Sequence, residues 1–210
     1  MQAVETLGAV AVLVLAVTLM LARTPEAAAT IYAWAVVPQA VIAVALGGWA
    51  GRPELFADAA LMLVIKGLWA PGLLRRAVRH DGEVYGQHAA FSASALLRGA
   101  AALSLLCLWV GLAILPRAGV ALGLGLAAMF VGWGTAAVRS ELWAQAAGVL
   151  MGEAGLMTAA LVLASGLPPL GETFALIEVV LLATLLGSGT RLVRATHGSH
   201  DSRLLRGLRG

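Results

Sequence analysis

Long apolar runs joined by short polar links make up most of this chain, and they predict helices that cross a membrane. A helix needs about 20 apolar residues to cross roughly 30 Å of hydrocarbon, whereas a membrane barrel would show alternating segments of about ten residues. The runs are long and rich in Ala, Leu and Gly. We therefore predict an all-α, polytopic transmembrane bundle with about seven spans, at roughly 4–22, 30–50, 55–79, 95–115, 118–138, 141–165 and 169–192.

Composition supports this class. Of the 210 residues, 60% are hydrophobic and only 12% are charged, which is typical of a multi-span membrane protein and excludes an ordinary soluble core.

The cations divide between the two sides of the predicted bundle and indicate its orientation. One set of links contains only Arg52 and Arg117. The other set contains Arg23, Arg75, Arg76, Arg79, Arg98, Arg139, Arg191, Arg194, Arg203, Arg206 and Arg209. Because cations near span ends stay in the cytoplasm, we expect the N-terminus outside and the C-terminus inside. The net charge of +3 then reflects topology and not a nucleic-acid partner.

Cysteine and histidine positions argue against a redox centre in this chain. Cys107 is the only cysteine and lies in a predicted span, so no thiolate zinc site or iron–sulfur cluster can form. The four histidines, His80, His88, His197 and His200, lie outside the spans. We expect no catalytic residue, no metal and no cofactor here.

Three ionisable residues fall inside predicted spans and are the main functional candidates. Glu153 lies about 18 Å along the sixth span, and Glu178 about 14 Å along the seventh, so antiparallel packing brings both carboxyls to a similar depth. Lys66 lies near the centre of the third span, ahead of Pro71. Ionisable groups at this depth usually serve ion or proton paths. The alternative is a static ion pair between Lys66 and one glutamate that fixes helix register.

Weaker candidates accompany these three. Asp58 and Glu172 lie closer to the predicted outer surface, where solvated positions are equally expected. Gly148 and Gly152 leave space beside Glu153, either for a neighbouring helix or for a file of water.

Two groups of residues also follow a family pattern. The first is Gln145, Gly148, Glu153, Gly155, Gly166, Pro169, Glu172 and Glu178, and the second is Lys66, Pro71 and Leu74. Together they resemble the HyfE-type membrane subunit of hydrogenase 4 and related formate hydrogenlyase complexes. Residues 118–192 are similar in turn to the three-helix K subunit of respiratory complex I, in which two successive helices each bear a buried glutamate of the proton pathway.

The resemblance implies three regions: a four-helix transmembrane part at 1–117, a K-subunit-like module at 118–192, and a basic cytoplasmic tail at 193–210. It implies Glu153 and Glu178 as proton relays, with Lys66 as a further relay or modulator. The chain differs from the complex I subunit in having a shorter link at 166–169. It also departs from the hydrogenase family, which often has Asp at the position of Glu178.

The function implied is a non-catalytic membrane subunit of a complex I-like, redox-driven, ion-translocating complex in the bacterial cytoplasmic (inner) membrane. Its implied partners are antiporter-like membrane subunits, a quinone-subunit-like membrane protein, and a peripheral oxidoreductase arm that holds the metal and iron–sulfur centres. The alternatives are a subunit of a multi-subunit cation/proton antiporter and a structural membrane anchor.

Overall fold

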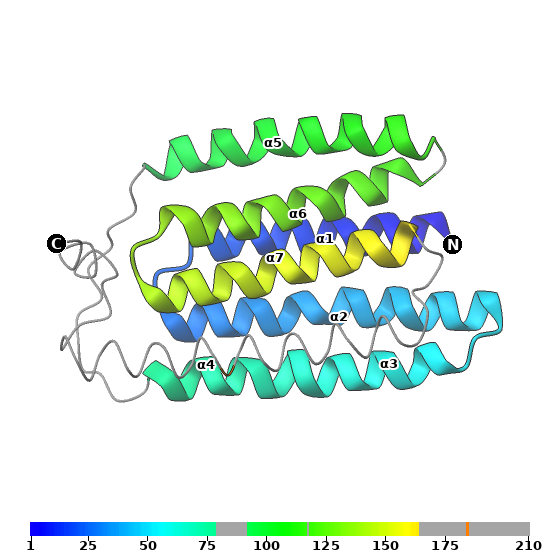
Figure 1. The fold of residues 1–210 in the computed structure, drawn as a ribbon, viewed down its shortest axis with the longest axis horizontal. Coiled ribbons are helices and arrows are strands. Elements are labelled where there is room, and N and C mark those ends of the chain that lie inside the picture. The colour runs from blue at the N-terminus through cyan, green and yellow to red at the C-terminus, as the bar shows by residue number, and fades with distance from the viewer. Residues whose placement is uncertain (79–91, 117, 164–183, 185–210) are drawn as a thin grey trace, which may run out of the picture.

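The computed structural model describes residues 1–78, 92–116, 118–163 and 184, and these form an antiparallel bundle of helices (Figure 1). The elements are α1 (Gln2–Met20), α2 (Pro25–Ala50), α3 (Glu54–Met62), the π-helix η1 (Leu63–Trp69), α4 (Ala70–Val78), α5 (Ala93–Ile114), α6 (Gly119–Val138) and α7 (Leu142–Leu163). No strand occurs in this part of the chain, which confirms the all-α prediction.

Among the described residues, six helices are long and apolar enough to cross a membrane, with α3, η1 and α4 joining into one of them, Glu54–Arg76. They match the first six predicted spans to within a few residues. The second begins earlier than predicted, at Pro25, because the Thr24 hydroxyl accepts a hydrogen bond from the Ala27 N–H and caps the helix. The predicted seventh span (169–192), with Glu172 and Glu178, lies outside the described residues, as does the tail at 193–210.

The helices run up and down, each antiparallel to the next span along the chain (Figure 1). The helices α1, α2, α6 and α7 lie centrally, with α5 along one edge and the α3–η1–α4 span along the other. We call the end of the bundle at which α2, α5 and α7 begin the Arg75 end, because Arg75 lies there in the last turn of α4. This is the end predicted to face the cytoplasm.

Glycines allow α6 and α7 to pack with their backbones in contact. A Cβ atom on Gly132 would lie 2.3 Å from the Gly152 nitrogen, and one on Gly155 would lie 2.1 Å from the Met129 nitrogen. The Gly148 and Gly152 spacing also serves this packing, because added Cβ atoms would collide with the Ala136 backbone and the Trp133 ring. Of the two sequence alternatives, helix packing therefore accounts for the space beside Glu153.

The edge helix α5 is held mainly by a similar glycine contact with α6. It is the least buried of the six long helices, and a Cβ atom on Gly111 would lie 2.2 Å from the Gly119 carbonyl oxygen. A Cβ atom on Gly123 would likewise lie 2.7 Å from the Cys107 carbonyl oxygen, so close backbone contacts with α6 set the position of α5.

We expect Gly111→Val to loosen α5 without unfolding the central helices, because the new side chain must push α5 away from α6. Hydrogen–deuterium exchange of the purified protein should show faster exchange confined to α5. Gly99→Val on the same helix is the control, since no atom lies within 4 Å of a Cβ atom there. Equal exchange in the two variants would contradict the assignment.

Candidate functional site

Lys66 and Glu153 form an ion pair deep inside the bundle. The Lys66 side chain is fully buried, the Glu153 side chain is 12% exposed, and the Nζ of Lys66 donates a hydrogen bond to Oε1 of Glu153 at 2.6 Å. Lys66 belongs to η1 and Glu153 to α7, so the pair joins the edge span to the central helices. Sequence reasoning gave both residues and, as one alternative, an ion pair between Lys66 and a glutamate, but it did not say which glutamate.

The cost of burying these charges makes the pair a functional candidate. A single charged side chain at the centre of a transmembrane helix costs about 2.5–3.5 kcal/mol on insertion scales. Their mutual attraction offsets this cost only where the geometry is close, as it is here. Such a pair can exist either as ammonium and carboxylate or, after one proton moves, as amine and carboxylic acid.

Lys66 lies in the middle of the π-helix, which is a rare conformation that occurs frequently at functional sites. The Ala70 N–H bonds to the Ile65 carbonyl, five residues back, as the widened helix requires. Pro71 offers a physical cause, since its ring lacks an N–H and would collide with the carbonyl four residues back in an α-helix. A proline within a helix usually kinks it, and here the helix instead widens around Lys66.

Two polar side chains on α2 approach the same region. Gln39 is fully buried, and its Nε2 donates a hydrogen bond of 2.9 Å to the Ala154 carbonyl, next to Glu153. Tyr32 is also fully buried and belongs to the same core cluster as Ala154, but its hydroxyl has no hydrogen-bond partner among the described residues. Sequence analysis singled out neither residue.

Polar groups also lie between the ion pair and each end of the bundle. Toward the Arg75 end, Nη2 of Arg75 donates a hydrogen bond of 2.9 Å to the exposed Thr30 hydroxyl. Toward the other end, two turns before Lys66, Asp58 is half-buried, and within the described part of the chain its Oδ2 is covered and has no hydrogen-bond partner. Asp58 is thus not fully solvated within this chain.

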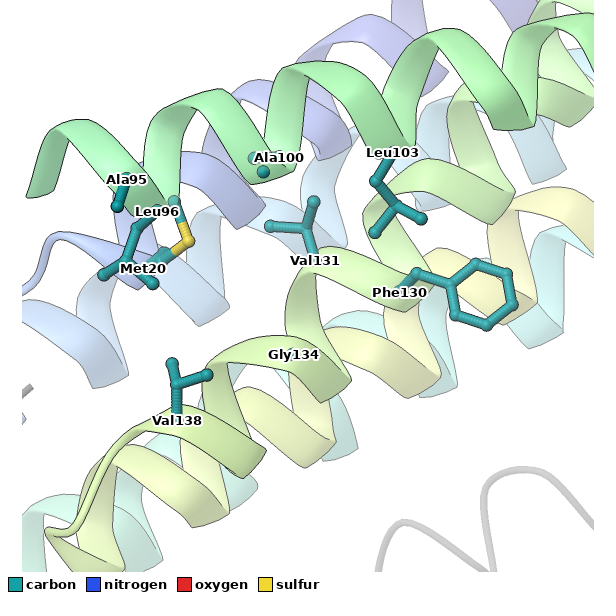
Figure 2. Close-up of a pocket in the computed structure, with 10 residues that line it drawn as sticks. Met20, Ala95, Leu96, Ala100, Leu103, Phe130, Val131, Gly134 and Val138 are labelled. Carbon is teal, nitrogen blue, oxygen red and sulfur yellow. The ribbon is translucent and has the colours of Figure 1, made fainter. Parts of the chain in front are cut away.

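A groove between α5 and α6 lacks the chemistry of a site (Figure 2). Its volume is about 520 Å³, and Leu96, Leu103, Phe130 and Val138 line it together with Met20 of α1 and small residues. No ionisable side chain lines it. In a bilayer this surface faces an apolar surrounding, so the ion pair remains the candidate site.

Within residues 1–78, 92–116, 118–163 and 184, no group of three or more His, Cys, Asp or Glu side chains could hold a metal ion. His80, His88, His197 and His200 lie outside these ranges. Comparisons with family models, with curated proteins and with solved structures found no match to the chain.

Proposed function

We propose that this chain is a non-catalytic membrane subunit that relays protons through Lys66 and Glu153. The observation that supports this most directly is the ion pair, which has a fully buried ammonium donor 2.6 Å from its carboxylate acceptor. A buried pair at this separation can exchange one proton without any large movement of the backbone. The adjacent π-helix and the polar side chains of α2 favour a role beyond packing.

The relay step moves one proton and conserves charge. The Lys66 ammonium gives a proton to the Glu153 carboxylate, which leaves an amine and a carboxylic acid. Glu153 then releases this proton to the next acceptor, and Lys66 takes a new proton from the opposite direction. Because the two groups are only 2.6 Å apart, a change in charge near either one can drive the cycle.

The wider assembly is proposed from the family resemblance. In it, Glu178 is the next relay, and antiporter-like and quinone-subunit-like membrane subunits flank the chain in the bacterial cytoplasmic membrane. A peripheral hydrogenase-like arm supplies the redox energy and holds the metal and iron–sulfur centres. The six long apolar helices support a multi-pass membrane location for the chain itself.

Proton translocation by the intact complex, purified through this chain and reconstituted in vesicles, tests the proposal. We expect Glu153→Gln to lower substrate-driven proton translocation by about tenfold or more, because an amide cannot accept the proton from Lys66. The same loss is expected for Glu178→Gln. Each variant is compared with wild type at equal subunit content.

Glu26→Gln is the matched control, since Glu26 is an exposed carboxyl in the first turn of α2. It should translocate protons at the wild-type rate. Unchanged translocation and unchanged redox turnover in Glu153→Gln would refute the relay and leave the static ion pair as the explanation.

A further inference from the structure

Tyr32 has a buried hydroxyl that packing alone does not explain. Its side chain is fully buried, yet its hydroxyl has no hydrogen-bond partner within the described ranges. Buried tyrosine hydroxyls usually find a partner, and leaving one unsatisfied costs about 1–3 kcal/mol. A phenylalanine would fill the same space without that cost, so the hydroxyl needs a separate reason.

The position of Tyr32 links it to the ion pair. It lies two helical turns before Gln39 on the same face of α2, and Gln39 bonds to the Ala154 carbonyl beside Glu153. Because α2 and α7 run in the same direction, Tyr32 lies about 10 Å nearer the Arg75 end than Gln39 does. Tyr32 also belongs to the same buried cluster as Ala154 of α7, and Ile65 of η1 packs against that cluster, so it shares a core with the residues beside Glu153 and Lys66.

Tyr32 lies within one helical turn of the exposed residue Thr30 at the Arg75 end of α2. Thr30, two residues earlier on α2, accepts the exposed hydrogen bond from Arg75. Along the axis of α2, Tyr32 therefore lies between the exposed contact of Thr30 with Arg75 and the buried ion pair, although Thr30 and Tyr32 point to different faces of the helix. Thr30 is exposed, Tyr32 is fully buried, and Glu153 is 12% exposed within the ion pair.

We infer that Tyr32 is a proton-relay residue that connects Glu153 with the Arg75 end of the bundle. A tyrosine hydroxyl both donates and accepts hydrogen bonds. It accepts the proton that Glu153 releases, over an intervening water molecule, while it gives its own proton to water on its Arg75 side, so it remains neutral and the proton passes to solvent. This inference rests on the proposed relay function and adds the direction from which the ion pair exchanges protons.

Tyr32→Phe in the intact complex tests the inference, because it removes the hydroxyl and keeps the ring. We expect proton translocation at equal subunit content to fall by about tenfold, while the melting temperature stays at or above that of wild type. The infrared carbonyl band of protonated Glu153, identified by its loss in Glu153→Gln, should also shift. If either the fall in translocation or the shift of the infrared band does not occur, the inference is overturned.

Thr135→Val is the matched control. Thr135 is also buried within the bundle, but its hydroxyl already donates to the Val131 carbonyl of its own helix at 2.8 Å. This variant should keep both the translocation rate and the infrared band. A loss of translocation equal to that of Tyr32→Phe would overturn the inference, because any buried hydroxyl would then have the same effect.

Two further comparisons complete the test. If Tyr32→Phe does not accumulate, 3-fluorotyrosine at position 32 replaces it. This residue keeps the ring and the hydroxyl but makes the hydroxyl more acidic. An unchanged translocation rate would then overturn the inference. The proposed function fails separately. If Glu153→Gln translocates protons normally, the relay proposed for the ion pair is wrong. If translocation falls in Glu153→Gln but not in Tyr32→Phe, only the role of Tyr32 is wrong.

Discussion

Replacing Lys66 with methionine is expected to destabilise the protein by about 3–5 kcal/mol, because it leaves the Glu153 carboxylate buried without its cation. Methionine fills a similar volume, so the loss reports the charge and not a cavity. The double variant Lys66→Met/Glu153→Leu should recover most of the stability, since a buried ion pair and an apolar pair are often equivalent. Chemical unfolding of the detergent-solubilised protein measures both effects.

Arg52→Met provides the comparison, because Arg52 and Glu54 form an ion pair of similar length, 2.8 Å, that is partly exposed. Its loss should cost no more than about 1 kcal/mol. Equal losses of stability in Lys66→Met and Arg52→Met would show that the burial of the first pair does not make the removal of its cation more costly. The double variant also separates the two functional alternatives: a relay predicts a stable protein without proton translocation, and a static ion pair predicts one with it.

Gly155→Val is expected to destabilise the bundle by about 3 kcal/mol, at the upper end of the range for overpacked sites. A Cβ atom at this position would lie 2.1 Å from the Met129 nitrogen, so the backbones of α6 and α7 would have to separate. Glu153 lies two residues away on α7, and its contact with Lys66 should weaken as well. Chemical unfolding and the yield of folded protein measure the effect.

Gly134→Val on α6 is the control for that substitution. It introduces the same β-branched side chain into a helix, but no atom lies within 4 Å of a Cβ atom at Gly134. Helix propensity favours Val over Gly by a few tenths of a kcal/mol, so this variant should be about as stable as wild type. A similar loss of stability in both variants would show that backbone contact between α6 and α7 is not the cause.

The helices themselves could be predicted from the sequence because span length is a direct consequence of bilayer thickness. The six long helices in the described part of the chain begin and end close to the predicted positions. The start of α2 was missed although its signal was present, since Thr24 followed by Pro25 is a typical helix beginning. Orientation and the seventh span remain predictions.

The candidate site could be predicted only in part. Lys66 and Glu153 were found because ionisable residues are rare within spans, but sequence alone does not show which helices are neighbours. The π-helix was not predicted, since Pro71 indicates a disturbance of the helix without specifying its form. Tyr32 and Gln39 were passed over because neither is charged at neutral pH, and only their complete burial distinguishes them.

The ion pair also makes the order of protein synthesis part of the folding problem. Lys66 and Glu153 are 87 positions apart, so at about 5–20 residues per second the ribosome needs roughly 4–17 s to supply the partner of a lysine already made. The span with Lys66 has the lowest mean hydropathy of the six. We expect it to be the last of the first three to leave the translocon, packed against the face of α2 that carries Tyr32 and Gln39 until α7 is made.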